Sequence, residues 1–160
     1  HQTIVAAQRR IWIASPYFVP DRGIVAALQL AALRGVDVRV MIPDEPDGPV
    51  VAMANWSFTN ELIACGVKVY RYQGGFMHQK VLLMDDQLAG VGTANFDNRS
   101  FRLNFEITLL VHDLFFARKV ESMLERDFDR SRLVVKEEIA NKPAWFTLGM
   151  AVARLFSPVL

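Results

Sequence analysis

The stretch from Met77 to Glu106 holds most of the side chains in this sequence that could carry out chemistry. His78 and Lys80 stand two positions apart, so a strand would point both side chains to one face. An imidazole is a nucleophile and a proton carrier near neutral pH, and a lysine ammonium binds phosphate as a point charge. This pair therefore predicts chemistry at a phosphoryl group.

Three further polar residues support that chemistry. Thr93 and Asn95 follow a glycine and offer hydrogen bonds without charge, while the glycine lets the backbone approach a ligand closely. Glu106 could accept the second ring N–H of His78, which would fix the tautomer of the imidazole and raise its basicity. Together these residues predict phosphoryl transfer through histidine without a metal.

A metal centre and a glycine-rich phosphate loop both fit these residues poorly. Lysine is a poor metal ligand, and no second histidine or cysteine stands at ligand spacing, so we expect no metal and no cofactor. The sequence contains no phosphate-binding loop of the GxxxxGK[ST] type. A histidine beside a strand is usually an ordinary core or surface residue. Here its polar partners occur in register with it, which favours a functional role.

The spacing of these residues resembles a known signature. His78-x-Lys80-x4-Asp85, followed by Gly92-Thr93-x-Asn95, is similar to the HxKxxxxD motif of the phospholipase D superfamily. Several longer runs resemble the C-terminal half of bacterial cardiolipin synthases: Ile11–Pro20, Gly35–Arg39, Phe76–Lys80, Gly92–Glu106 and Arg154–Leu160. The resemblance covers nearly the whole chain. The loop Asp44–Pro49 departs from the family pattern. The pattern has a basic residue in this loop and a histidine after Asp47, and this sequence has neither.

The resemblance implies roles for single residues. His78 would be the nucleophile or the general acid, and Glu106 would orient it. Lys80 and Asn95 would bind the substrate phosphate together with Thr93, which stands where serine is commoner and keeps the hydroxyl. Asp85 completes the catalytic motif, although in this family it is more often a structural ion-pair partner.

The resemblance also implies an activity. We expect a phosphatidyltransferase that joins two phosphatidylglycerols into cardiolipin and releases glycerol through a phosphohistidine. The alternatives are another phospholipase D-type phosphodiesterase, such as a phospholipase or a nuclease, and a non-catalytic half that supports a partner half. The implied location is the bacterial cytoplasmic membrane, with the active domain on its cytosolic face.

The expected partners are a phospholipid, a membrane surface and a second half with its own histidine. In-line transfer needs a nucleophile and an acid on opposite sides of phosphorus. The second half would come from upstream in the same polypeptide or from a second copy across a two-fold axis. The start at His1 rather than at methionine indicates a fragment of a longer protein.

Composition is that of one globular domain. The chain has 160 residues, of which 52% are hydrophobic, enough to bury a single core. A net charge of +1 argues against broad nucleic-acid binding, which favours a strongly basic face. Cys65 is the only cysteine, so an internal disulfide is excluded.

Strand and helix patterns alternate along the chain. They predict an α/β fold with a mixed, mostly parallel sheet flanked by helices. We expect residues 1–135 to form a phospholipase D-like half-domain. Within it we expect strands at 11–14, 36–42, 67–72, 81–84, 88–91 and 107–111, and helices at 2–10, 22–33, 50–64 and 114–130.

Two apolar features have an open interpretation. Tyr17 and Phe18 follow the first strand, where α/β folds place ligand loops, and form either an apolar wall for a lipid or ordinary loop packing. Residues 136–160 contain an apolar helix that begins near Trp145 and breaks at Pro158. This helix lies in a membrane interface or packs on its own or a missing domain, and the resemblance to a membrane enzyme favours the interface.

Overall fold

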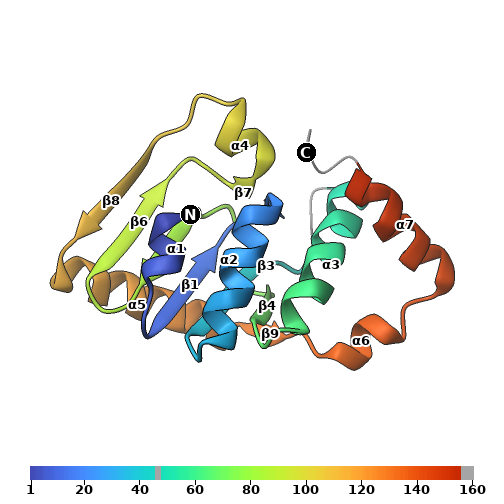
Figure 1. The fold of residues 1–160 in the computed structure, drawn as a ribbon, viewed down its shortest axis with the longest axis horizontal. Coiled ribbons are helices and arrows are strands. Elements are labelled where there is room, and N and C mark those ends of the chain that lie inside the picture. Colours follow the sequence, from blue (N-terminus) through green and yellow to red (C-terminus); the bar gives the residue numbers. More distant parts are fainter. Residues whose placement is uncertain (46–47, 156–160) are drawn as a thin grey trace.

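The computed structural model describes residues 1–45 and 48–155 (Figure 1). Residues 46–47, in the loop that departs from the family pattern, lie outside the described residues, as does the helix break expected at Pro158. The described residues form a seven-stranded sheet in the order β8-β6-β5-β1-β3-β4-β9, and a separate pair formed by β2 and β7.

The centre of the sheet is parallel. It consists of β1 (Arg10–Ala14), β3 (Asp37–Pro43) and β4 (Lys68–Tyr72), connected through helices α2 (Arg22–Leu33) and α3 (Pro49–Ile63). Antiparallel strands extend it on both sides: β5 (Val81–Met84), β6 (Leu88–Gly92) and β8 (Thr108–His112) beside β1, and β9 (Ser131–Leu133) beside β4. The short pair β2 (Phe18–Val19) and β7 (Phe96–Asp97) is parallel.

The prediction of a mixed α/β sheet is confirmed, but the sheet is not mostly parallel. Within the described residues, only the pairs β1–β3 and β3–β4 of the large sheet are parallel. Parallel neighbours need a long crossover, whereas a short turn joins antiparallel strands directly. The turn between β5 and β6 is of this second kind, and Asp85 adopts a positive φ of 49° there.

Helices cover both faces of the sheet (Figure 1). One face packs against α1 (Gln2–Ala6), α2 and α3, with buried residues such as Ile13, Leu28 and Leu62. The other face packs against α5 (Leu114–Asp129), where Trp12 and Phe128 meet edge to face. The core stripe expected on α5 is confirmed, since Val120, Leu124 and Phe128 are buried.

Local signals in the sequence set several helix boundaries. The side chain of Asp21 accepts a hydrogen bond from the N–H of Ile24 and caps α2, and Gly35 ends this helical segment with a φ of +89°. Helix α1 is shorter than expected. The chain after Ala6 turns toward β1, where backbone N–H groups from Gln8 onward bind the Asp85 carboxylate instead of continuing the helix.

The loop after β1 is more regular than its two prolines indicate. Phe18 and Val19 pair with β7, and the ring of Phe18 stacks on Phe96 with 6.2 Å between centroids. Phe18 is only 1% exposed, so the loop-packing interpretation holds for it and its side chain forms no surface wall. The expected lipid contact of Tyr17, which is half-buried, stays a prediction.

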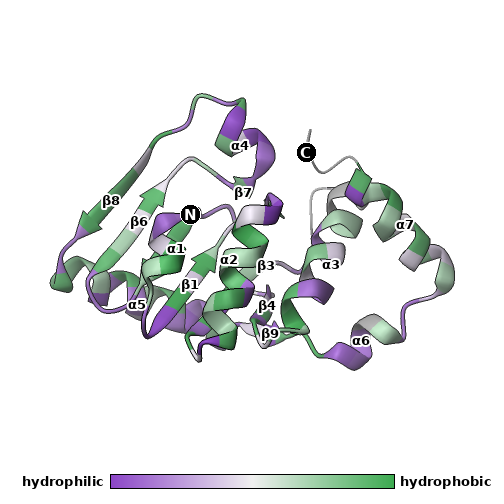
Figure 2. Cartoon of the chain, in the orientation of Figure 1, coloured by the Kyte–Doolittle hydropathy of each residue, from purple (hydrophilic) through white to green (hydrophobic). Residues whose placement is uncertain are grey.

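The C-terminal segment contains α6 (Lys136–Ala140) and α7 (Ala144–Leu155). Helix α7 packs on α3, where Gly149 lies so close to Met53 that a Cβ on the glycine would be 2.6 Å from its sulfur. Met150 and Ala153 are buried on this inner face. Much of α7 is coloured as hydrophobic in Figure 2. Four of its large apolar side chains are exposed: Trp145, Leu148, Val152 and Leu155. Among the described helices, none is long and apolar enough to cross a membrane.

Candidate active site

His78 and Lys80 lie just before β5, in residues that belong to no helix or strand. The carbonyl oxygen of Lys80 accepts a hydrogen bond from the N–H of Gly92 at 3.2 Å, which fixes this segment against the end of β6. The Lys80 Nζ donates to the carbonyl oxygen of His78 at 2.9 Å. The His78 side chain is exposed and stacks on the ring of Phe76, with centroids 5.5 Å apart. A nucleophilic or proton-carrying group therefore stands beside a cation at the surface.

A close crossing of two chain segments positions Thr93 and Glu106. A Cβ on Gly92 would lie 2.3 Å from the carbonyl oxygen of Ile107, so only glycine permits this approach. The N–H of Thr93 donates to the Ile107 carbonyl at 2.9 Å, and the Thr93 Oγ1 accepts from the Ile107 N–H at 3.0 Å. These two bonds hold Glu106, the residue before Ile107, next to the loop that follows β6.

A short hydrogen-bond chain then joins Asn95 to Glu106. The N–H of Asn95 donates to Ser100 Oγ at 3.1 Å, and that hydroxyl donates to Glu106 Oε1 at 3.3 Å. Asn104 Nδ2 donates to the same carboxylate oxygen at 3.2 Å. The side-chain amide of Asn95 makes no hydrogen bond within the described part of the chain, and its Oδ1 is buried. Asn95 Oδ1 is thus a buried acceptor without a partner among the described residues.

The charges at the site support one another. Burial lowers the pKa of the Lys80 ammonium, and the carboxylates of Glu106 and Asp97 oppose that shift. Hydrogen bonds from Thr93, Asn104 and Ser100 hold the pKa of Glu106 below its ordinary value, and the charge of Lys80 acts in the same direction. Each of the two charges therefore favours the charged form of the other group.

Asp85 lies away from this group of residues, at the far end of β5. Its carboxylate accepts hydrogen bonds from the backbone N–H groups of Gln8, Arg9 and Arg10, at 2.8 to 3.2 Å. The Asp85 side chain thus fixes the entry to β1, and its expected place among the catalytic residues stays a prediction. The ion pairs at this turn are formed by the neighbouring Asp86, with Arg9 and Arg10.

The contact expected between Glu106 and His78 is not formed. In the described structure Glu106 accepts from Ser100 and Asn104, and no hydrogen bond joins it to His78. Glu106 instead lies close enough to Lys80 to influence its charge. The structure thus brings Lys80, Thr93, Asn95 and Glu106 together. The Lys80 ammonium bonds to the His78 carbonyl oxygen, while the imidazole stacks on Phe76.

This arrangement can act on a phosphate diester. An imidazole can attack phosphorus or move a proton, while an ammonium and an amide stabilise negative charge on the phosphoryl oxygens. Among the described residues, no group of three histidine, cysteine, aspartate or glutamate side chains could hold a metal ion.

Comparison with known proteins places this chain in a family. Residues 1–128 match the family model described as "Cardiolipin synthase, PLD-like domain". The chain belongs to this family. The expected resemblance to the phospholipase D superfamily and to cardiolipin synthases is confirmed.

The similar curated proteins carry the same description. The chain is 54% identical to cardiolipin synthase A of Pseudomonas entomophila, over 99% of the chain and 33% of that protein. It is 50% identical to cardiolipin synthase A of Pseudomonas syringae pv. syringae, with the same coverage. The chain thus spans about a third of the length of these relatives.

Solved structures share the fold at low identity. Nuc of Salmonella typhimurium, a phospholipase D family member, aligns with a TM-score of 0.74 at 21% identity, over 83% of this chain and 86% of its own. Phosphatidylserine synthase of Haemophilus influenzae aligns with a TM-score of 0.77 at 18% identity, over 99% of this chain and 43% of its own. These likenesses confirm the phospholipase D-like α/β fold.

Sequence reasoning did not single out Ser100 and Phe76. Ser100 links Asn95 to Glu106, and its own N–H donates to the Asp97 side chain that caps α4 (Asn98–Arg102). The spacing of Asp97 and Ser100 is that of a helix cap, so this contact carried a signal. The only sequence signal for the stacking of Phe76 on His78 was their separation of two residues, which would put both side chains on one side of an extended chain.

Proposed function

We propose that the whole protein containing this chain transfers a phosphatidyl group between two phosphatidylglycerols, forming cardiolipin and releasing glycerol. The observation that carries this proposal is the exposed side chain of His78 close in the chain to the half-buried ammonium of Lys80, which bonds to the His78 carbonyl oxygen, at the edge of the sheet where Asn95 and Glu106 meet. The relatives described as cardiolipin synthase A support this substrate over other phosphate diesters.

The reaction would proceed in two displacements at phosphorus. In the first, an imidazole nitrogen forms a bond to phosphorus, the bond from phosphorus to the glycerol oxygen breaks, and a second imidazole protonates the leaving glycerol. In the second, a hydroxyl oxygen of the other phosphatidylglycerol attacks phosphorus, the N–P bond breaks, and the hydroxyl proton passes to the second imidazole. His78 supplies one of the two imidazoles.

The remaining site residues would stabilise charge. The Lys80 ammonium and the Asn95 amide contact the phosphoryl oxygens as negative charge develops on them, with Thr93 at the same edge. The charge of Glu106 favours the protonated form of Lys80 and opposes the lowering of its pKa by burial. Phosphoryl transfer of this kind depends mostly on positioning and electrostatics, which fixed backbone contacts around Lys80 and Thr93 favour.

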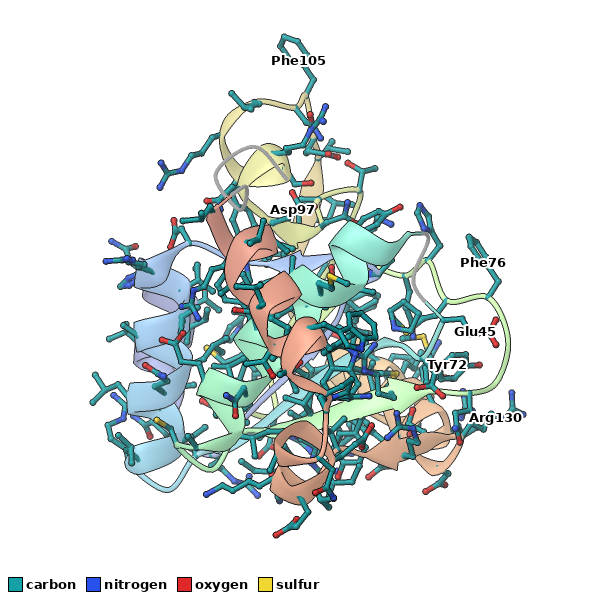
Figure 3. All side chains as sticks on the ribbon, turned by 90° about the vertical axis from the view of Figure 1, so that its right-hand side faces the viewer. Glu45, Tyr72, Phe76, Asp97, Phe105 and Arg130 are labelled. Atoms are coloured by element: carbon teal, nitrogen blue, oxygen red, sulfur yellow. The ribbon has the colours of Figure 1, made fainter. Side chains whose placement is uncertain are left out.

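The second imidazole would come from another half of the enzyme. His78 cannot act on both sides of phosphorus, because its segment is fixed by the bond between Lys80 and Gly92. Strand β8 is an edge strand with exposed Leu109 and Leu110, and Phe105 projects away from the molecule just before it (Figure 3). Such an apolar edge suits the docking of a second half, upstream in the same polypeptide or in a second copy.

A membrane surface is the other proposed partner. The stripe of Trp145, Leu148, Val152 and Leu155 gives α7 a continuous apolar outer face, and the phospholipid substrate resides in a bilayer. We therefore assign residues 1–135 to the catalytic half-domain and residues 136–160 to a segment that lies on the cytosolic face of the bacterial cytoplasmic membrane.

Incubation of the whole protein with phosphatidylglycerol labelled in its headgroup and acyl chains tests this function. The expected products are cardiolipin and free glycerol in equal amounts. Phosphatidic acid as the only lipid product would indicate a phospholipase, and cleavage of DNA without any lipid turnover would indicate a nuclease. Either result would overturn the proposed transfer.

A further inference from the structure

A pocket of about 600 Å³ opens beside the candidate active site, where β3 and β4 end. Its walls include Asp44 and Glu45 after β3, and Tyr72, Gln73 and Phe76 after or at the end of β4. Glu45, Tyr72 and Phe76 lie on the same side of the molecule (Figure 3). Nothing in the proposed phosphate site uses these five side chains.

Phe76 connects this pocket to His78. The ring of Phe76 lines the pocket and stacks on the imidazole at 5.5 Å. A smaller cavity of about 210 Å³ is lined by His78 and shares Tyr72, Phe76 and Met77 with the larger pocket. A group held in the larger pocket therefore lies against the ring that His78 touches.

The pocket is held in shape by backbone and side-chain contacts. The N–H of Asp44 donates to the Tyr72 carbonyl at 3.0 Å, and the Asp44 carboxylate accepts from Gln73 Nε2 at 3.0 Å and from Arg132 Nη2 at 3.1 Å. The Tyr72 ring packs closely on Gly74, since a Cβ on this glycine would lie 2.4 Å from the Tyr72 hydroxyl oxygen.

Two polar groups on the wall are free to bind a ligand. In the part of the chain that the structure describes, the Glu45 carboxylate makes no hydrogen bond or ion pair, and the Tyr72 hydroxyl makes no hydrogen bond. A carboxylate accepts strong hydrogen bonds from hydroxyl groups. The rings of Tyr72 and Phe76 offer apolar faces to the C–H groups of the same ligand.

The charges around the pocket favour a neutral ligand. No lysine or arginine side chain lines it among the described residues, which disfavours a phosphate group. Two arginines partly neutralise the negative charge of the carboxylates. Arg132 pairs with Asp44, and the buried guanidinium of Arg71 donates to the Pro43 carbonyl at 3.1 Å. An ammonium ligand would therefore bind with less favourable electrostatic energy here than beside two carboxylates without neighbouring arginines.

We propose that this pocket binds the glycerol headgroup of phosphatidylglycerol, with the Glu45 carboxylate and the Tyr72 hydroxyl bonded to its hydroxyl groups. This proposal rests on the proposed function and adds the subsite that selects the alcohol. In an in-line mechanism the leaving and the entering oxygen occupy the same side of phosphorus, so one subsite serves both. His78 then protonates the leaving glycerol oxygen and accepts the proton of the entering hydroxyl, while the P–O bond breaks and later forms again.

The partition of the phosphatidyl group between competing acceptors tests the proposal. The whole protein is given labelled phosphatidylglycerol together with free glycerol, free ethanolamine and water, and the ratio of transfer products to phosphatidic acid is measured. This ratio is set within each turnover, so it does not depend on how much of a variant is folded. The variants are Glu45→Gln and Tyr72→Phe, and the matched control is Glu137→Gln, an exposed carboxylate on α6 outside the pocket.

Glu45→Gln should lower the partition toward glycerol-bearing acceptors by about tenfold relative to water, which is the effect of losing one charge-assisted hydrogen bond. Tyr72→Phe should lower it less, and Glu137→Gln should leave it unchanged. An unchanged ratio in Glu45→Gln, or stronger competition by ethanolamine than by glycerol in the unaltered protein, would overturn the subsite. Failure of the unaltered protein to transfer to any acceptor would instead overturn the proposed function, and the subsite with it.

Discussion

At the scale of single residues, the charge of Lys80 is the property on which the proposed chemistry depends. Its ammonium is half-buried, and burial lowers its pKa. Glu106 opposes this shift and is itself kept ionised, chiefly through hydrogen bonds from Thr93 and Asn104. Glu106 therefore acts on Lys80 in this structure, and its expected role as the partner of His78 stays a prediction.

The substitution Glu106→Gln should move the alkaline limit of activity to lower pH. The carboxylate of Glu106 raises the pKa of Lys80, so removal of its charge lets burial lower that pKa further. The ammonium is then lost at a lower pH on the alkaline side. The pH profile of kcat/KM measures this shift, with Glu137→Gln as a control that keeps the profile. An unchanged alkaline limit, or one at higher pH, would contradict this account of Lys80.

The substitution Asp85→Ala should affect stability far more than chemistry. It leaves three backbone N–H groups without their acceptor and places alanine at a positive φ. We expect a loss of about 2 kcal/mol in the free energy of unfolding, with Asp85→Asn milder because asparagine tolerates this φ. Urea titration measures the loss. A fully stable Asp85→Ala variant with greatly reduced turnover would show instead that Asp85 takes part in the reaction.

At the scale of the elements, helix α7 has two apolar faces with different surroundings. The inner face packs on α3, with Met150 and Ala153 buried. The outer face exposes Trp145, Leu148, Val152 and Leu155 at helical spacing (Figure 2). A helix that needed only to cover α3 would present polar residues outward.

The double substitution Trp145→Ser and Leu148→Ser should weaken binding to vesicles. Both side chains are about two-thirds exposed, so their removal takes apolar surface from the proposed membrane contact without opening the core. Flotation of this chain with phosphatidylglycerol vesicles measures the effect. Leu33→Ser is the control, since Leu33 is equally exposed on α2. Unchanged flotation together with a lowered melting temperature would indicate that the stripe serves packing.

Sequence patterns predicted the elements better than their assembly. The cap at Asp21, the stop at Gly35 and the apolar stripe of α5 are local signals, and the helices form where these signals lie. The direction of strand pairing depends on which elements meet in space, so the antiparallel pairs on both sides of β1, β3 and β4 were underestimated. Burial of Phe18 likewise depends on Asn55 and Phe96, which are distant in the sequence.

The candidate site shows the same division. His78, Lys80 and Asn95 were predicted because their types and spacing carry chemistry on their own. The engagement of Glu106 with Ser100 and the position of Asp85 at the far end of β5 were not predicted as geometry, since both depend on how the segments fold back. The types of the side chains thus predict which reaction is possible, and the three-dimensional contacts determine which of these residues lie together in the site.

At the scale of the whole molecule, this chain holds one proposed catalytic histidine and an apolar edge beside it. Strand β8 ends the sheet with Leu109 and Leu110 exposed, and the chain spans about a third of the length of its relatives. An exposed apolar edge strand is a surface that pairs readily with another chain. Both observations fit a site completed by a second half.

The isolated chain of 160 residues should therefore show no turnover as a monomer. Without a second imidazole, attack and proton donation cannot occur on opposite sides of phosphorus. Sedimentation establishes the oligomeric state, and labelled phosphatidylglycerol measures turnover at the same concentration. Addition of the remaining part of the protein should restore activity. Clear turnover by a demonstrated monomer would contradict the two-half site.

The role of His78 is the central claim, and the turnover of His78→Ala in the whole protein tests it most directly. His112→Ala is the matched control, because His112 is also exposed but lies on β8 beside the end of β6 that is remote from Gly92. If His78 attacks phosphorus or transfers the proton, turnover should fall by roughly 1000-fold or more, while the melting temperature and vesicle binding stay unchanged. His112→Ala should keep normal turnover. Near-normal cardiolipin formation by folded His78→Ala would contradict the account.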